Sequence, residues 1–218
     1  MSGIDPLVLR ELAHEVQSLT ELGAEVAIVV GGGNFIRGHL SARYGIQRVT
    51  ADQVGMLGTV MNGLALRDVL EDSGQRTAIY SAVEMGAIVA SYRRDAALND
   101  LRDGRMVIFV AGLGSPFFTT DTTAAVRGLE MGAEVFLKAT KVDGVYDKDP
   151  ETDPEAIKFD TISYEEVLRL HLKVIDSAAV ALCMDHQLPI IVFKIGGKGV
   201  MRRLAQGEGV GTLIGRMG

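Results

Sequence analysis

The chain has 218 residues, 47% of them hydrophobic, which suits one α/β domain with a sizeable core. Its formal net charge of −6 argues against nucleic-acid binding driven by bulk charge. No apolar run approaches the roughly 20 residues of a membrane span, and residues 1–6 lack the pattern of a signal peptide. We therefore expect no membrane span, no nucleic-acid partner and a cytoplasmic protein.

Cysteine and histidine are scarce in this sequence. The single Cys183 cannot form an intrachain disulfide, which fits a reducing cytosol, and we expect a small buried hydrophobe rather than a reactive thiol. With 4 histidines and one cysteine, the spacing indicates no metal-ligand cluster. Any metal is expected to be Mg²⁺ that is bound through substrate phosphates.

The hydrophobic pattern predicts helices and strands that alternate along the chain. Asp5 and Pro6 predict the start of a helix that Gly23 ends. The further elements expected in the first half are a strand at 25–30, a helix at 51–70, a strand at 76–80, a helix at 93–102 and a strand at 106–110. In the second half we expect a helix at 124–131, a strand at 134–138, a charged loop at 141–153, helices at 164–171 and 177–186, a strand at 189–193, a helix at 199–206 and an edge strand at 211–214.

This alternation predicts an α/β fold with a mostly parallel sheet covered on both faces. We see one domain over residues 1–218, with no repeat or low-complexity linker. Ligands of such sheets bind beyond the carboxyl ends of the strands. Two glycine-rich loops, at 31–38 and 111–118, leave their strands at that end and can share one crevice.

Both glycine loops resemble phosphate-binding turns. Thr119, Thr120 and Asp121 follow the second loop as natural N-caps, and a helix N-terminus offers unpaired N–H donors to a phosphate. Neither loop has the complete G-x-G-x-x-G pattern, and a G-x-x-x-x-G-K-[ST] motif is absent, which excludes a P-loop NTPase. Either loop alone could be only a tight turn. Together they indicate two phosphorylated ligands and hence phosphoryl transfer.

Charged and aromatic residues near these loops offer further contacts. The guanidinium of Arg37 could clamp a phosphate or form a surface salt bridge. In the segment 138–150, Tyr146 could pack against a nucleobase or anchor the loop on the core. Asp52 could cap the long helix that follows it.

Five blocks carry a resemblance to a known family: GGGNFIRG (31–38), ADQVGMLGTVMNGLALRD (51–68), PFFTTDTTAA (116–125), KATKVDGVYDKDP (138–150) and KVIDSAA (173–179). From Gly3 to Ile214 the chain resembles the bacterial uridylate (UMP) kinases of the amino acid kinase superfamily. The resemblance implies a three-layer sandwich with a mostly parallel central sheet, the carbamate kinase-like fold. It also implies transfer of the γ-phosphoryl of ATP to UMP, giving UDP for pyrimidine nucleotide biosynthesis, with Mg²⁺. A cytoplasmic homohexamer with GTP and UTP as allosteric effectors is expected on the same ground.

The resemblance assigns the site residues. The UMP-binding residues are Gly32, Asp52, Leu113, Gly114, Ser115, Pro116, Phe117, Phe118, Thr119 and Thr120. The ATP-binding residues are Gly33, Arg37, Thr140, Tyr146 and Asp149, and the catalytic residues are Arg37, Lys138 and Asp176. Asp52 would accept hydrogen bonds from the ribose, while Arg37 and Lys138 would balance charge on the moving phosphoryl group. Leu113 has no side-chain donor, so uracil recognition there would rest on backbone groups.

Members of this family begin with a strand that ends in a Lys-Leu-Ser-Gly loop, before the segment that corresponds to Gly3. We expect this chain to lack that strand and to transfer phosphoryl groups more slowly than an N-terminally extended form. One alternative is a catalytically silent nucleotide- or anion-binding homologue. Another is a kinase for a carboxylate such as an amino acid, which Asp52 disfavours because like charges repel.

Overall fold

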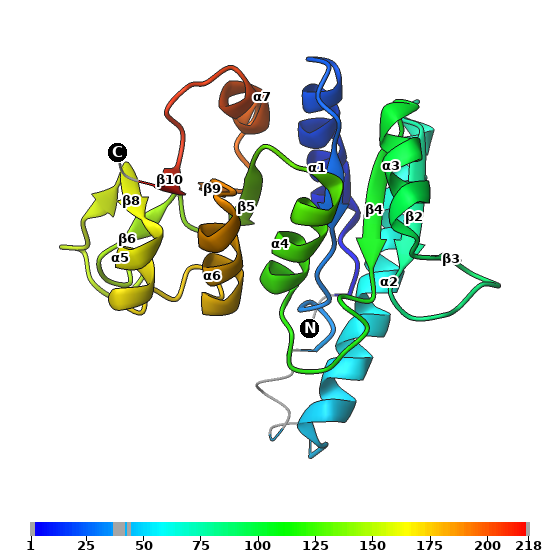
Figure 1. Cartoon of the computed structure of the whole chain (residues 1–218), viewed down its shortest axis with the longest axis horizontal. Coiled ribbons are helices and arrows are strands. Elements are labelled where there is room, and N and C mark those ends of the chain that lie inside the picture. The colour runs from blue at the N-terminus through cyan, green and yellow to red at the C-terminus, as the bar shows by residue number, and fades with distance from the viewer. Residues whose placement is uncertain (1–2, 37–41, 43–44, 217–218) are drawn as a thin grey trace. The chain divides into compact units, whose positions relative to one another are not determined.

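The computed structural model describes residues 3–36, 42 and 45–216, and the chain divides into two compact units, Met1–Thr123 and Ala124–Gly218 (Figure 1). The expectation of a single domain stays a prediction, because the units are defined by their internal contacts alone. None of the helices in the described part of the chain has the length and apolarity needed to cross a membrane.

The Met1–Thr123 unit is built on a four-stranded parallel sheet. Its strands are β1 (Ala27–Val29), β2 (Thr77–Ser81), β3 (Ala90–Ser91) and β4 (Met106–Val110), in the order β1-β4-β2-β3. All five residues of β4 are buried, as expected for an apolar run between two neighbouring strands of a covered sheet.

Among the described residues of this unit, the α-helices that lie wholly within it are α1 (Pro6–Thr20), α2 (Arg48–Asp72) and α3 (Arg94–Arg102). The Asp5 carboxylate accepts the N–H of Leu7 at 2.9 Å, so the predicted cap of α1 is confirmed. Helix α2 packs on one face of the sheet, where a side chain on Gly63 would overlap Val110 and lie 3.2 Å from Ile79.

Helix α3 packs on the opposite face of this sheet, because side chains alternate along a strand. Tyr80, the neighbour of Ile79 on β2, donates its hydroxyl hydrogen to Asp100 of α3 at 2.6 Å. Burial, together with this hydrogen bond, raises the pKa of Tyr80 to about 12. The phenol therefore remains a neutral donor throughout the physiological range.

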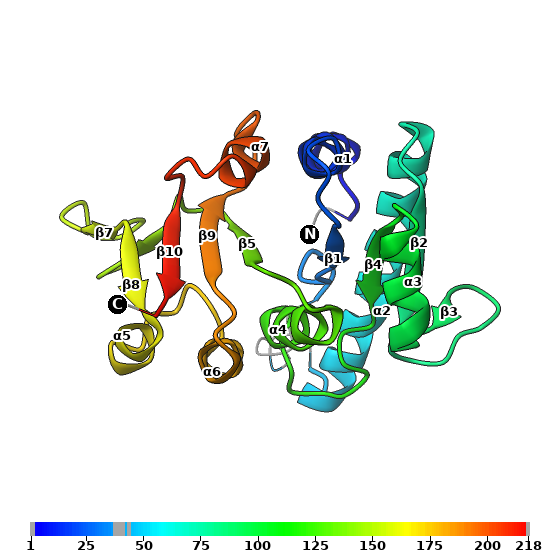
Figure 2. The ribbon, with the colours of Figure 1, turned by 45° about the horizontal axis from the view of Figure 1, so that its top comes forward.

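The Ala124–Gly218 unit has its own four-stranded sheet, with β5 (Phe136–Thr140), β9 (Ile190–Lys194), β10 (Thr212–Gly215) and β8 (Thr161–Ser163) side by side (Figure 2). Two of its three pairings are parallel, and β9–β10 is antiparallel. The further elements are β6 (Val145–Tyr146), which pairs antiparallel with β7 (Lys158–Phe159), and the helices α5 (Tyr164–Arg169), α6 (Ser177–His186) and α7 (Val200–Ala205). Helix α4 (Thr120–Met131) crosses the boundary between the units.

The predicted α/β class with mostly parallel strands is confirmed, and several details were wrong. The last strand, β10, lies between β9 and β8 rather than at an edge, because its antiparallel pairing with β9 leaves its other side open to β8. The charged loop contains β6. Helix α2 begins at Arg48, so Asp52 lies inside it and does not cap it. Helix α4 begins at Thr120, which makes Thr120 and Asp121 helical rather than capping residues.

The core of the second unit surrounds Cys183. The thiol is fully buried in a cluster with Ile190, Val192 and Ile214, which are also buried completely. Burial raises the pKa of the Cys183 thiol to about 11. The expectation of a small buried hydrophobe is confirmed, and a thiolate nucleophile is disfavoured at neutral pH.

Replacing Gly63 tests the close packing of α2 on the sheet. Gly63→Ala is expected to lower the free energy of unfolding by about 1–2 kcal/mol, since overpacking outweighs the higher helix propensity of alanine. Urea denaturation measures this. Gly55→Ala is the matched control on the same helix, because the nearest atom would lie at an ordinary contact distance of 3.7 Å. It should leave stability unchanged or raise it by up to about 1 kcal/mol. Equal stability of the two variants would contradict the packing described.

Thiol accessibility tests the core of the second unit. Ellman's reagent should label the native chain at pH 8 only at the rate of unfolding, because Cys183 is buried and protonated. In guanidinium chloride one thiol per chain should react rapidly, and the single cysteine makes the signal unambiguous. Rapid labelling of the native chain would show that the cluster around Cys183 is open to solvent.

Candidate active site

The loop after β4 is held in an unusual backbone conformation. Four of its residues have positive φ: Ala111 (61°), Gly112 (59°), Gly114 (76°) and Phe117 (71°). Alanine and phenylalanine rarely adopt this region, so surrounding contacts must hold the loop in place. One such contact is the Ala111 N–H, which donates to Thr59 Oγ1 of α2 at 2.6 Å.

The first glycine loop continues the parallel pairing of β1 and β4, since the Val30 N–H donates to the Phe109 carbonyl at 3.2 Å. Gly32 is buried against α2, where a side chain would overlap the Gly55 carbonyl. Asn62 of α2 donates to the Gly31 carbonyl at 2.8 Å. A side chain on Gly31 would lie 3.4 Å from the Thr120 hydroxyl at the start of α4. The first glycine loop therefore approaches the start of the helix that follows the second glycine loop, beyond the carboxyl ends of β1 and β4, which agrees with the predicted place of a shared site.

Asp52 joins α2 to the loop after β4. Its Oδ2 accepts the Phe117 N–H at 2.9 Å. Arg48, one turn earlier on α2, donates Nε to Oδ1 at 2.9 Å and to Oδ2 at 2.8 Å. The Arg48 guanidinium carbon also lies 5.6 Å from the centre of the Phe117 ring, at cation–π distance. Asp52 is thus oriented toward the second glycine loop.

The remaining residues assigned to UMP lie on the same loop and at the first residue of α4. Thr119 caps α4, because its side-chain oxygen accepts the Thr122 N–H at 3.2 Å. Phe117 and Phe118 expose 64% and 54% of their surface, which is high for aromatic residues. Half-buried residues are Leu113 and Pro116, and exposed ones are Gly114, Ser115, Thr119 and Thr120.

The residues assigned to ATP lie mostly in the second unit. Thr140 ends β5 opposite Lys194 of β9, and its carbonyl accepts the Ile195 N–H at 2.8 Å. Asp149 is exposed, and its Oδ1 accepts the Glu151 N–H at 2.9 Å in a tight turn. Gly33 is an exposed residue of the first unit, and Arg37 lies outside the described residues.

Tyr146 is anchored by a short chain of polar contacts. Its hydroxyl donates to Asp143 Oδ1 at 2.6 Å, and Lys158 Nζ lies 3.2 Å from Asp143 Oδ2. The hydrogen bond from Tyr146, followed by that from Lys158, holds the pKa of Asp143 below its usual value. Asp143 therefore stays ionised and fixes the direction of the phenol.

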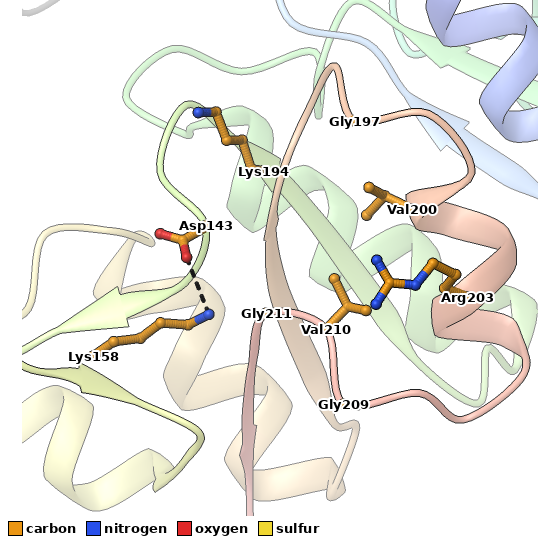
Figure 3. Close-up of a pocket in the computed structure, with 9 residues that line it drawn as sticks. All are labelled: Asp143, Lys158, Lys194, Gly197, Val200, Arg203, Gly209, Val210 and Gly211. Carbon is orange, nitrogen blue, oxygen red and sulfur yellow. Dashed lines mark hydrogen bonds and ion pairs between the residues drawn. The ribbon is translucent and has the colours of Figure 1, made fainter.

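A cationic pocket of about 300 Å³ lies beside this chain of contacts, in the second unit (Figure 3). Its lining residues are Asp143, Lys158, Lys194, Gly197, Val200, Arg203, Gly209, Val210 and Gly211. Arg203 extends from α7 toward Val210 and pairs with Glu208 at 2.6 Å. Lys194 makes no ion pair with any described residue. The pocket thus offers one positive charge that is not already compensated.

Two glycines shape the surroundings of this pocket. A side chain on Gly211 (φ +89°) would overlap the Val192 carbonyl. A side chain on Gly144 would lie 2.5 Å from the Thr212 hydroxyl and 2.6 Å from Lys158 Cε. Thr212 in turn accepts the Val145 N–H at 2.9 Å and donates to the Phe159 carbonyl. Only glycine therefore allows these segments to approach one another so closely.

The two other residues assigned to catalysis are half-buried in the second unit. Lys138 lies on β5 opposite Val192, and Asp176 caps α6 by accepting the Ala178 N–H at 3.3 Å. Their roles, like those of the other assigned residues, stay predictions. Across the described ranges, no group of three or more His, Cys, Asp or Glu side chains is arranged to hold a metal ion.

Sequence reasoning missed Arg48, Thr59 and Lys194. Arg48 and Asp52 have the i,i+4 spacing of a helical ion pair, but this signal requires that α2 begin at Arg48, three residues before the predicted start. Thr59 gave no local signal, because its partner Ala111 is distant in sequence.

Comparison with known proteins gives one consistent result. The model of the amino acid kinase family matches residues 2–194. A uridylate kinase of Marinobacter nauticus is 51% identical over 212 residues, 97% of this chain and 88% of that protein.

Solved structures agree with this result. The UMP kinase of Bacillus anthracis has a TM-score of 0.91 and 42% sequence identity, and the match covers 95% of this chain and 86% of that chain. The UMP kinase of Ureaplasma parvum has a TM-score of 0.92 and 32% sequence identity, and the match covers 99% of this chain and 92% of that chain. The uridylate kinase of Archaeoglobus fulgidus is more distant, with a TM-score of 0.73 and 26% identity over 96% and 93% of the two chains. With a family model that spans most of its length and relatives that match nearly all of it, this chain belongs to the amino acid kinase family.

Proposed function

We propose that this chain is a uridylate kinase that transfers the γ-phosphoryl group of ATP to UMP and releases ADP and UDP. The observation that carries the proposal is the contact between Asp52 and the Phe117 N–H, which joins two segments that resemble a nucleoside monophosphate site. The 51% identity to a uridylate kinase supports the same activity and gives the catalytically silent alternative no support.

The acceptor side of this reaction would use the Met1–Thr123 unit. Asp52 suits ribose hydroxyls, because an ionised carboxylate only accepts hydrogen bonds. The phosphate of UMP would bind where Gly31 approaches the Thr120 hydroxyl, at the N-terminus of α4, where the helix dipole places a partial positive charge. The backbone of the loop around Leu113 would read the base.

The donor side would use the Ala124–Gly218 unit. Tyr146, fixed by Asp143, offers a ring face to adenine, and the charge of Lys194 suits a phosphate. Lys138 would stabilise negative charge on the transferred group, since positioning and electrostatics supply most of the catalysis in phosphoryl transfer. Mg²⁺ would enter with ATP on its phosphate oxygens and neutralise their charge. The described carboxylates form no group of three that could hold the ion, so we assign it no protein ligands.

We further propose, from the resemblance to the family, a cytoplasmic homohexamer that GTP activates and UTP inhibits, acting in pyrimidine nucleotide biosynthesis. The exposed apolar side chains Val54, Leu57 and Met61 on α2 are compatible with subunit contacts. Size-exclusion chromatography with light scattering tests the assembly. Initial rates with added GTP and UTP test the effectors.

A coupled assay of ADP release tests the proposed reaction. With Mg²⁺-ATP, UMP should support turnover at least about tenfold more efficiently than CMP, and acetylglutamate should support none, because Asp52 would repel an acidic acceptor. UDP should be identified as the product by chromatography. Binding of UMP in calorimetry without any turnover would contradict the proposal and favour a silent binding protein.

Replacing Lys194 tests whether the phosphates of ATP bind in the cationic pocket. Lys194→Ala is expected to raise KM for ATP about tenfold and to leave KM for UMP unchanged, because a charge-assisted hydrogen bond contributes about 1.5–3 kcal/mol. Lys198→Ala is the matched control, since Lys198 lies on the same segment but does not line the pocket. Equal KM values for ATP in the two variants would rule out the pocket as the phosphate site.

A further inference from the structure

Arg48 is not among the residues assigned to the site, but its side chain contacts two residues that are, Asp52 and Phe117. It lies at the first residue of α2, and its side chain is 39% exposed, whereas that of Asp52 is 12% exposed. Nε alone provides both hydrogen bonds to the carboxylate, at 2.9 and 2.8 Å. Surface ion pairs contribute little to stability, so this arrangement is better suited to orienting Asp52 than to holding the helix together.

Arg48 also contacts the opposite segment of the site. Its guanidinium carbon lies 5.6 Å from the centre of the Phe117 ring, and the Phe117 N–H donates to the carboxylate that Arg48 holds. Phe117 has a positive φ of 71°, a conformation that needs support from its neighbours. Arg48, Asp52 and Phe117 therefore form a closed set of contacts, and a change in Arg48 must affect both the carboxylate and the loop.

The hydrogen bonds that Asp52 makes with the described residues leave an acceptor position open on Oδ1. A carboxylate has about four acceptor positions, two on each oxygen. Oδ2 accepts from Arg48 Nε and from the Phe117 N–H, whereas Oδ1 accepts only from Arg48 among the described residues. One further donor can therefore bind at Oδ1 without displacing a protein contact. A sugar hydroxyl has the required chemistry.

We propose that Arg48 is a positioning residue that directs Asp52 Oδ1 at a ribose hydroxyl and thereby sets the preference for ribonucleoside over deoxyribonucleoside monophosphates. This inference rests on the proposed function, because it concerns the acceptor of that same reaction. Arg48 acts through Asp52 and touches no reacting atom. Without it, the carboxylate loses two of its three bonds and can rotate away from the sugar.

Sugar discrimination is a readout that a merely structural role would not change. We would measure kcat/KM of the wild type and of Arg48→Ala with UMP, 2′-deoxy-UMP and 3′-deoxy-UMP. The wild type should prefer UMP to at least one deoxy acceptor by about 10- to 100-fold, as expected for a hydrogen bond to a charged group. In Arg48→Ala this preference should fall about tenfold, mainly through a higher KM for UMP, with KM for ATP unchanged.

A matched control lies on the same helix. Arg67 forms an ion pair with the exposed carboxylate of Asp68 at 2.9 Å, so Arg67→Ala removes a comparable pair away from Asp52. It should keep the wild-type sugar preference. Arg48→Lys retains the charge but lacks the planar Nε donor, and it should also lose preference. It carries the test if Arg48→Ala does not fold, as judged by circular dichroism and thermal melting.

A double-mutant comparison separates action through Asp52 from direct contact with the sugar. In the Asp52→Asn background, adding Arg48→Ala should not lower the sugar preference further. A further drop would overturn the positioning role, as would an Arg48→Ala preference within twofold of the wild type. The proposed function fails separately, because in that case the wild type itself would show no UMP-dependent release of ADP.

Discussion

The close approach of α2 to its surroundings is the constraint on which the Met1–Thr123 unit depends. Gly63 brings the helix against β2 and β4 with no room for a side chain, and Gly32 lies against the helix backbone at Gly55. Glycine costs helix stability, so its place in the middle of α2 reflects packing rather than propensity.

Because the backbones are so close, short side chains of α2 can reach both glycine loops. Thr59 holds the strained Ala111, Asn62 holds Gly31, and Asp52 holds Phe117. One rigid helix thus fixes two loops that leave neighbouring parallel strands, and loops locked in this way need little reorganisation when a ligand binds.

In the second unit, the charges around the pocket determine which ligands it suits. Two of the three cations around its pocket are compensated by Asp143 and Glu208, and Lys194 is left to attract an anion. Asp143 also accepts the hydroxyl hydrogen of Tyr146, so one carboxylate both orients the aromatic ring and compensates the charge of Lys158. A nucleotide combines an apolar base with charged phosphates and therefore suits such a surface.

Local pattern was sufficient for the class of fold and for most elements. The apolar run of β4, the Asp5–Pro6 helix start and the buried Cys183 were all predictable, because each depends on near neighbours in sequence or on hydrophobicity alone. The motifs around Gly31, Thr120 and Tyr146 likewise indicated a phosphoryl-transfer enzyme and its family, because each motif is a continuous run of residues. The sequence by itself therefore determined the class of fold, most of the elements, the chemistry and the family.

Only the tertiary structure decided which side chains meet. The place of β10 between β9 and β8, the bond from Ala111 to Thr59 and the set formed by Arg48, Asp52 and Phe117 join residues that are far apart in the chain. Such pairings depend on strand order and on the exact start of α2, and local propensity encodes neither of these. The physical reason is that a hydrogen bond requires contact distance, which packing of the whole unit creates.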